Sequence, residues 1–314
     1  MCGPRAAARL GVMPLQFATR RAGRPRYWRP LPLETADTVC GEGNVAAQPV
    51  HAHEAVQVIL PGSRFAVTDG RGRAAVVGPG DLYVAAPLEL IGAQSLDGEP
   101  CIARVILVGP SALSRLRVEP SELWRGTAPG GRQFVLHDPG LYAELWTLVG
   151  DLRGPLVSLA CGPRLLGCLT RLLTQLAPEP VAAAKSRSGR QVDGVRRVCA
   201  HLRAHVADNV SLDDLAHVAG LSKFYLLRAF RRAHGVTPHA YQMQLRLAHA
   251  WRLIVDGRPL SRTTYDAGFA DQSHLTRRFA EVFGLTPARY ARELALLPGV
   301  ESASASGISV PAAA

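Results

Sequence analysis

A pattern of short helices that occurs twice near the C-terminal end of this 314-residue chain constrains its fold most strongly. The first copy, AGLSKFYLLRAFRRAHGVTP, covers residues 219–238, and the second copy, AGFADQSHLTRRFAEVFGLTP, covers residues 267–287. Phe230 aligns with Phe279 at an offset of 49 residues, and the Gly and Thr-Pro that follow also align. Because the segment is basic, two successive units that read a nucleic acid are the hypothesis that the repeat favours.

Charge is unevenly distributed along the chain. Residues 1–33 hold 7 Arg and no acidic residue, and residues 190–293 hold 16 Lys and Arg against 9 Asp and Glu. The formal net charge of the whole chain is +11, so the middle of the chain is mildly acidic. This asymmetry predicts a sensing part joined to a part that binds a polyanion. High Arg usage throughout is the alternative interpretation, and it does not explain the asymmetry.

Cysteine usage and the absence of long apolar runs bear on the compartment. The 6 Cys are scattered without a CxxC pair, which is typical of neither a disulfide framework nor a zinc site. No apolar run approaches the ~20 residues that a membrane helix needs. We therefore expect a soluble, cytoplasmic protein with no membrane partner. Residues 1–33 and 294–314 are expected to be disordered tails, and a translation start at Met13 is an alternative for the first of them.

The residues around the first copy are those of a helix-turn-helix unit that follows a helix over residues 195–207. Ser211 and Asp214 form a variant of the capping box before a short helix over residues 212–218. Gly220 permits a sharp reversal, and a serine then caps a helix over residues 223–234. This order of helix, tight turn and helix predicts a unit whose last helix enters a major groove.

The second copy repeats this arrangement after a connecting helix. Residues 238–255 predict a helix of about 26 Å at 1.5 Å per residue, which stops at Asp256-Gly257-Arg258-Pro259. A helix over residues 260–266, a turn at 267–269 and a reading helix over 271–283 follow. A connector of that length can set two reading helices about one duplex turn apart, roughly 34 Å.

Each reading helix has a face that DNA can reach. An Arg on such a face can bridge O6 and N7 of guanine or clamp a phosphate, and a solvated charged face is the bland alternative. The candidate DNA contacts are Lys223, Phe224, Leu227, Arg228 and Arg231 in the first unit and Gln272, Ser273, His274 and Arg277 in the second.

The two copies also resemble a known family. GFADQSHLTRRFAEVFGLTPARYARE (268–293) and LSKFYLLRAFRRAHGVTPHAY (221–241) closely resemble the double helix-turn-helix domain of the AraC/XylS regulators, over about 100 residues. The resemblance implies that the same helix positions contact DNA. One departure is Thr263-Thr264, which stands where members usually carry an Ile-Ala pair. We therefore expect the second unit to be less well packed. Because the first unit is also fully capped and carries Arg228 and Arg231, whereas the second has a more polar reading face, we expect Arg228→Ala to weaken binding more than Arg277→Ala.

Residues 38–108 predict short β-strands in place of helices. The expected strands cover residues 55–60, 64–68, 73–77, 82–86 and 102–108. Asp69-Gly70 and the Gly-Pro-Gly-Asp run at 78–81 predict tight turns. Short strands at this spacing indicate an antiparallel sandwich or small barrel. Through His51-Ala52-His53 and Pro79-Gly80-Asp81, the segment resembles the cupin-like sensor domain of AraC-type regulators.

That resemblance raises the question of a metal. His51 and His53, two apart on a strand, would face the same side of a sheet, and Gln57 could supply a later ligand. A cupin site also needs a distant His, which the segment after residue 81 does not offer. We therefore expect no metal, no other cofactor and no catalytic site, but a pocket for a small-molecule effector. The candidate lining residues are His51, His53, Gln57, Arg64 and Tyr83.

Helices are expected again between the strands and the repeat. Residues 141–152 and 156–176 show apolar spacing of three and four, with a leucine stripe at Leu159, Leu166, Leu169, Leu173 and Leu176. Such a helix could cover the barrel or pair with a second copy of itself. Helices at this position often dimerise in the AraC family, and the resemblance therefore implies a homodimer.

Together these observations predict an α+β protein. A cupin-like antiparallel β-barrel with flanking helices covers residues 34–177, a linker covers 178–194, and an all-α domain of two helix-turn-helix units joined by a long helix covers 195–293. The expected function is ligand-responsive transcription regulation on double-stranded promoter or operator DNA, with RNA polymerase as a candidate partner. The alternatives are a cupin-type metalloenzyme with a helical appendage and a helical adaptor that binds protein.

Overall fold

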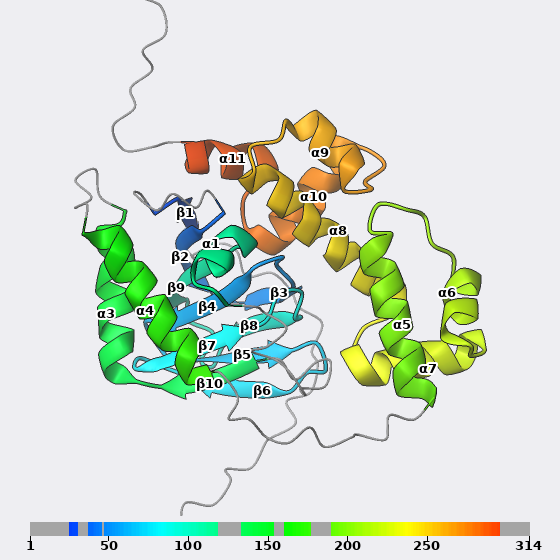
Figure 1. Cartoon of the computed structure of the whole chain (residues 1–314), viewed down its shortest axis with the longest axis horizontal. Coiled ribbons are helices and arrows are strands. Elements are labelled where there is room, and N and C mark those ends of the chain that lie inside the picture. Colours follow the sequence, from blue (N-terminus) through cyan, green and yellow to red (C-terminus); the bar gives the residue numbers. More distant parts are fainter. Residues whose placement is uncertain are drawn as a thin grey trace, which may run out of the picture.

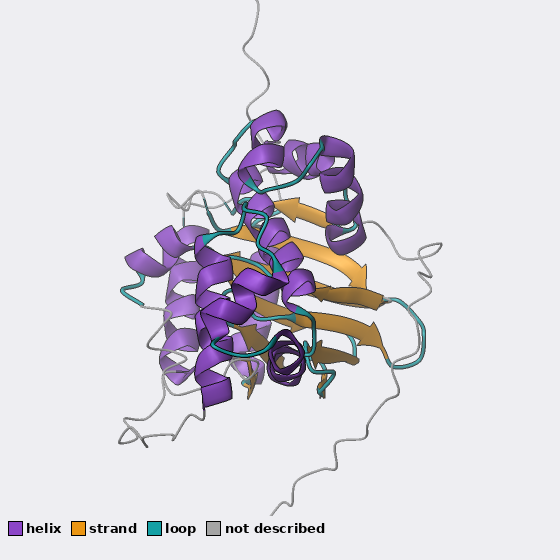
Figure 2. Ribbon diagram, turned by 90° about the vertical axis from the view of Figure 1, so that its right-hand side faces the viewer, coloured by secondary structure: helices purple, strands orange, loops and turns teal. Residues whose placement is uncertain are grey.

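The computed structural model describes residues 25–30, 37–45, 47–118, 133–153, 160–176 and 190–295. These residues form a β-sandwich with helices on one side, followed by a helical domain that lies along the sandwich (Figure 1). Figure 2 shows the same layers after a quarter turn, with the strands stacked beside the helices. None of the described helices is long and apolar enough to cross a bilayer.

One sheet of the sandwich has six described strands, all antiparallel to their neighbours. In spatial order they are β1 (Arg26–Trp28), β2 (Val39–Val45), β9 (Cys101–Val108), β4 (Val56–Pro61), β7 (Asp81–Ala85) and β10 (Gln133–His137). The central strand β4 is buried along its whole length, because this sheet is covered on both faces.

The second sheet has four described strands, again antiparallel. Its order is β3 (Ala47–His51), β8 (Ile91–Ser95), β5 (Phe65–Asp69) and β6 (Ala74–Val77). The tight turn predicted at Asp69-Gly70 connects β5 to β6, and the turn predicted at 78–81 leads into β7. Antiparallel strands are therefore as predicted, whereas the described strands form two separate hydrogen-bonded sheets and not one closed barrel. Side chains such as Phe65 and Tyr83 share one apolar cluster between the sheets.

Helices cover the outer face of the six-stranded sheet. They are α1 (Pro110–Arg115), α3 (Pro139–Asp151) and α4 (Cys161–Leu176). Leucines of α3 and α4 share one apolar core with Val58, Leu82 and Ile106 of the sheet. Arg104 ties the sheet to α3 as well, since its guanidinium lies 4.2 Å from the ring centre of Trp146 and also pairs with Glu42.

The leucine stripe on α4 is buried within its own domain. Leu169, Leu173 and Leu176 face the core shared with α3 and the sheet, Leu166 is half-buried, and Leu159 lies outside the described residues. The sequence left open whether this stripe covers the strands or pairs with a second copy of the chain. In the structure, the stripe covers the sandwich. A dimer contact would need other surfaces of this segment.

The helical domain contains α5 (Arg190–Ala204), α6 (Leu212–Ala219), α7 (Lys223–His234), α8 (Pro238–Val255), α9 (Leu260–Asp266), α10 (Gln272–Phe283) and α11 (Pro287–Ala295). It has two apolar cores. Tyr241 and Leu245 of α8 pack with α5, α6 and α7, whereas Met243 and the apolar residues from Leu247 onward pack with α9, α10 and α11. The helix α8 thus belongs half to one unit and half to the other.

Two expected boundaries differ from the observed elements. The helix α5 begins at Arg190, inside the predicted linker, because Val195, Val198 and Leu202 anchor a helix that extends one turn further back. The strand β1 lies inside the predicted disordered tail. It is held in place because Trp28 is buried and Tyr27 packs against Tyr290, with ring centres 4.5 Å apart and ring planes tilted by 39°. The rest of both regions lies mostly outside the described residues.

Candidate nucleic-acid interface

The helix α7 is fixed at both ends by its own sequence. The side chain of Ser222 accepts a hydrogen bond from the Tyr225 amide, and Gly235 ends the helix in the left-handed conformation. Leu226 and Phe230 are fully buried against α5 and α8. Because these inward residues fix the rotation of the helix about its axis, the opposite face is presented to solvent.

The helix α10 repeats these features in the second unit. Asp271 accepts a hydrogen bond from the His274 amide at 2.7 Å, and Gly284 ends the helix in the left-handed conformation. Leu275 and Phe279 are fully buried, at positions equivalent to Leu226 and Phe230. Both helices therefore hold an outward face in the same orientation relative to their own unit.

The predicted DNA contacts lie on these outward faces. Arg228, Arg231, Gln272, Ser273 and Arg277 are exposed, Leu227 and His274 are half-buried, and Phe224 has 71% of its surface exposed. His274 is held by an edge contact with the Phe269 ring. The structure thus brings each predicted set together on one helix face.

Lys223 differs from the other predicted contacts because it is already paired. Its Nζ atom lies 2.6 Å from Oδ1 of Asp213 in α6, and both side chains are largely exposed. Arg228, by contrast, forms no ion pair with any residue that the structure describes, and the same holds for the equivalent Arg277. An acidic residue therefore stands beside the reading face of the first unit.

Thr263 and Thr264 are well accommodated in the second unit. Both are buried, and the Thr264 hydroxyl donates to the Leu260 carbonyl oxygen at 2.9 Å. The Thr263 hydroxyl lies 3.5 Å from the Arg258 carbonyl oxygen. Because the helix backbone satisfies the hydroxyl groups, these buried positions cost less than two unpaired hydroxyls would. The expected weak packing at this site is therefore not observed.

The sandwich contacts the C-terminal end of α7. Arg71, in the turn between β5 and β6, donates from Nε to the Ala233 carbonyl oxygen at 2.6 Å. A Cβ on Gly70 would lie 2.5 Å from the His234 carbonyl oxygen, so the two backbones are in direct contact. A cation at a helix C-terminus is favourable because the last carbonyls are unpaired there.

The sandwich also contacts the C-terminal end of α10. His51 and His53 lie against Phe283, with ring centres 6.2 Å and 5.3 Å away, and His53 also meets Trp251 of α8 edge to face. Gln48 lies 3.4 Å from the Val282 carbonyl oxygen. Burial lowers the pKa of both histidines, so both are neutral near pH 7.

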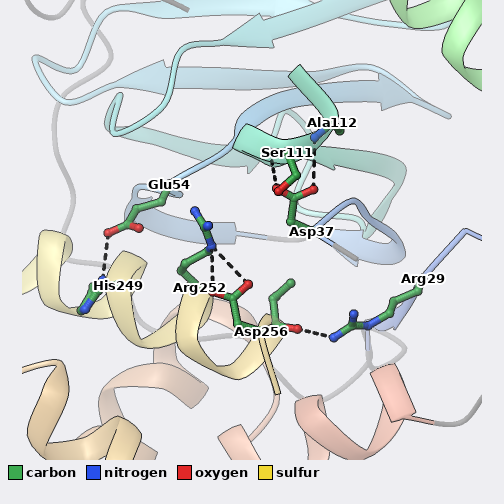
Figure 3. A network of polar contacts seen from close by, with 9 residues as sticks. Arg29, Asp37, Glu54, Ser111, Ala112, His249, Arg252 and Asp256 are labelled. Atoms are coloured by element: carbon green, nitrogen blue, oxygen red, sulfur yellow. Dashed lines mark hydrogen bonds and ion pairs between the residues drawn. The ribbon is translucent and has the colours of Figure 1, made fainter. Parts of the chain in front are cut away.

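Further polar contacts join the sandwich to α8, as Figure 3 shows. Glu54 accepts from Nδ1 of His249 at 3.3 Å, and Arg29 donates to the Val255 carbonyl oxygen. The hydrogen bond to Glu54 raises the pKa of His249 above its usual value, and partial burial opposes this rise. The sandwich is therefore connected to α8 as well as to both reading helices.

The predicted effector residues are divided between two places. Gln57 and Tyr83 lie on the strands β4 and β7 that line the space between the sheets, and the Tyr83 hydroxyl donates to Gln133. Arg64 is exposed before β5. His51 and His53 lie instead at the contact with the helical domain. Among the described residues, no group of three or more His, Cys, Asp or Glu is arranged to hold a metal ion.

Sequence reasoning missed the residues that connect the domains. Arg71 follows the predicted Asp69-Gly70 turn, and a basic residue at a hairpin tip carries no signal of a partner 162 positions away. Tyr225 and Tyr265 were also missed, although they are 54% and 71% exposed. The sequence signal that could have revealed the exposure of Tyr225 is its position on the helix, on a different face from the buried Leu226 and Phe230.

Comparisons with known proteins agree with this arrangement. Residues 215–293 match the family model described as a helix-turn-helix domain. The chain is 31% identical over 209 residues to the uncharacterized HTH-type transcriptional regulator YbfI of Bacillus subtilis, covering 64% of this chain and 71% of that protein. It is 28% identical over 245 residues to the transcriptional activator NphR of Rhodococcus, covering 72% and 68%.

The fold of the whole chain has a counterpart among solved structures. The crystal structure of ToxT from Vibrio cholerae O395 superposes with a TM-score of 0.50 at 13% identity, covering 83% of this chain and 99% of that one. The matched helix-turn-helix model and the transcriptional regulator with 31% identity define the chain as a DNA-binding transcription regulator. The chain belongs to the AraC/XylS family of helix-turn-helix transcriptional regulators.

Proposed function

We propose that this regulator reads two adjacent major grooves of promoter or operator DNA, with α7 in one groove and α10 in the next. The observation that carries the proposal is the pair of capped helices, each with an exposed polar face, on two units joined by α8. The 18 residues of α8 span about 27 Å at 1.5 Å per residue. That length is comparable with the roughly 34 Å between neighbouring grooves on one side of a duplex.

The chemistry of the outward faces supports different roles for their residues. Arg228 and Arg277 occupy equivalent positions without an ion-pair partner in the described part of the chain, which suits bidentate contact with guanine. Gln272 suits adenine, and the exposed ring of Phe224 suits a thymine methyl group. Lys223 and Arg231 suit phosphates, which position the helix without reading sequence.

Selection from a random double-stranded DNA library tests this function. We expect a bipartite motif with two half-sites about one helical turn apart, and binding that falls steeply with salt. Arg228→Ala and Arg277→Ala should each relax the preference at one half-site and cost about 1–3 kcal/mol. A protein-binding adaptor would enrich no motif, and neither substitution would change its binding.

A second function, response to an effector, is favoured by the contacts of the sandwich. The sandwich contacts the C-terminal ends of both reading helices, through Arg71 on one and His53 on the other. A cupin-like sensor that binds a small molecule between its sheets, near Gln57 and Tyr83, would therefore move two readers at once. A homodimer and contact with RNA polymerase fit the same role, on surfaces other than the α4 leucine stripe.

Arg71→Met tests whether the sandwich influences DNA binding by α7, and the test needs no known effector. Arg71 lies at the end of α7 that would not enter DNA, so a pure DNA contact model predicts no effect. We expect DNA affinity of the full chain to fall about two- to fivefold, since a lost hydrogen bond costs about 0.5–1.5 kcal/mol and frees α7. Arg153→Met, which breaks a pair with Glu42 within the sandwich, is the control. Equal DNA affinities for the two variants would contradict the coupling.

A further inference from the structure

One arginine lies at the boundary between the two units of the helical domain. Arg246 occupies the middle of α8, between Leu245, which packs in the core of the first unit, and Leu247, which packs in the core of the second. Because the two units have separate apolar cores, the angle between them depends on α8, on the polar contacts beside it and on the sandwich, which packs against both units.

Arg246 fixes the end of α5 in the first unit. Its Nε atom donates to the Val206 carbonyl oxygen at 3.0 Å, and its Nη2 atom donates to those of Ala207 at 3.3 Å and Asp208 at 3.0 Å. Nη2 also lies 3.3 Å from Oδ1 of Asn209. These carbonyls follow the last turn of α5, where the backbone has no helical partner, so the guanidinium supplies both hydrogen bonds and a favourable charge.

The same arginine touches the turn of the second unit. Gly268, between α9 and α10, has a φ of +76°. A Cβ built on Gly268 would lie 2.6 Å from the Ala207 Cα atom and 2.9 Å from Nε of Arg246. The end of α5, the middle of α8 and the turn before α10 therefore meet at one point. This contact joins the two units beside α8.

We infer that Arg246 is a positioning residue that fixes the angle between α7 and α10 and so sets the half-site spacing that the protein accepts. Arg246 binds the backbone that follows α5, and that backbone is pressed against the turn that starts α10. Without the guanidinium, the segment 206–209 keeps one hydrogen bond to α8, from Gln242 to the Asp208 carbonyl oxygen at 2.8 Å. It loses the bonds to the Val206 and Ala207 carbonyl oxygens, so the angle between the units is held less tightly. The inference rests on the proposed reading of two adjacent grooves.

The test compares spacing preference with half-site affinity in the full-length protein. The probes are the bipartite duplex selected by the wild-type protein, the same duplex with one base pair inserted between half-sites, and a duplex with one half-site scrambled. One inserted base pair rotates the half-sites by about 35° and separates them by about 3.4 Å. If α7 and α10 are held at a fixed angle, they cannot bind both half-sites after such a change without strain. The protein then loses the extra affinity that comes from binding two half-sites at once.

We expect the wild-type protein to lose about tenfold in affinity on the insertion, and Arg246→Met to lose less than about threefold. Binding of Arg246→Met to the scrambled duplex should stay within about twofold of wild type, because the methionine leaves both cores intact. Arg197→Met is the matched control. Arg197 donates to the Val218 and Ala219 carbonyl oxygens inside the first unit. Its loss should weaken half-site binding and leave the spacing preference unchanged.

Two glycine substitutions give a second test that does not depend on the arginine variant folding. Gly220 and Gly268 have φ values of +62° and +76°, so alanine strains both turns. At Gly220 the nearest atom to a new Cβ is Nη2 of Arg197 at 3.7 Å, whereas at Gly268 it is backbone of the other unit. Gly268→Ala should shift the preferred spacing, and Gly220→Ala should not.

The outcomes separate this inference from the proposed function. If the wild-type protein enriches no DNA motif, the proposed reading of two grooves fails. If it enriches a bipartite motif, but Arg246→Met and Gly268→Ala keep the wild-type spacing profile, the positioning role is wrong while the reading of two grooves stands. Enrichment of a single half-site would overturn the positioning role as well.

Discussion

Neutralising Asp213 should strengthen DNA binding. The carboxylate of Asp213 lies 2.6 Å from Nζ of Lys223, at the start of the helix that we place in the major groove. The ion pair with Asp213 competes with a contact between Lys223 and a phosphate, so we expect Lys223 to neutralise a phosphate fully only when the acid is removed. Asp213→Asn removes the competing charge and keeps the size of the side chain.

The expected size of the effect follows from the exposure of the pair. The two side chains are 54% and 71% exposed, and pairs of this kind contribute about 0–1 kcal/mol to stability, so folding should change little. In the wild-type protein the same 0–1 kcal/mol opposes the movement of Lys223 from Asp213 to a phosphate. Asp213→Asn removes this cost, so the variant should bind DNA up to about fivefold more tightly. One further neutralised phosphate steepens the slope of log K against log salt by about 0.9, or roughly threefold in affinity between 50 and 200 mM salt.

Fluorescence anisotropy with a labelled duplex over that salt range measures both quantities. Glu281→Gln is the matched control, because Glu281 pairs with Arg278 at 3.1 Å on α10, outside the predicted reading residues. We expect a steeper slope and tighter low-salt binding for Asp213→Asn alone. If Lys223→Gln weakens binding equally with and without Asp213→Asn, the two residues do not compete and the reasoning is refuted.

Two further predictions concern the reading residues and the contact between domains. Arg228→Ala should weaken binding to the selected duplex more than Arg277→Ala in a gel-shift titration, because the exposed face of α7 is more basic than that of α10, and the reverse order would make the second unit the anchor. The pKa of His249 is raised above its usual 6.5, chiefly by the hydrogen bond to Glu54, so its stabilisation is fully present below about pH 6.5 and is lost as pH rises through the raised pKa. The melting temperature lost on Glu54→Gln should therefore shrink from pH 6 to pH 8.5, and a loss independent of pH would contradict this. Buried His51 and His53 titrate in the opposite sense in both proteins, so they cancel in the difference.

The helical domain could be predicted closely because its boundaries are encoded locally. Ser211, Ser222 and Asp271 each accept the hydrogen bond from the first turn that their positions predict, and Gly235 and Gly284 end the reading helices. Such caps act over three or four residues, so the sequence alone identifies them. The fit of Thr263 and Thr264 was misjudged because the backbone carbonyls that accept their hydroxyl groups cannot be read from composition.

The sandwich was less predictable because its pairing is not local. The strands β2 (VCGEGNV) and β3 (AQPVH) lack a run of β-branched residues, and their structure comes from partners far along the chain, β9 and β8. The predicted effector residues failed to converge for a related reason. The pairing of β3 with β8 shifts register between Gln48 and His51, and His51 and His53 lie against Phe283 of the helical domain. No local pattern signals such a bulge.

The opposite ends of the reading helices have different neighbours, and this has a thermodynamic consequence. Most of the proposed groove residues lie in the N-terminal halves of α7 and α10, whereas the last residues of both helices rest on the sandwich at Arg71 and His53. DNA and sandwich can therefore hold the same two helices together without displacing each other. Linkage then requires reciprocity: an effector that changes DNA affinity by some factor must have its own affinity changed by that factor when operator DNA is bound. Under the proposed function, operator DNA would therefore change the affinity of the sensor for its effector.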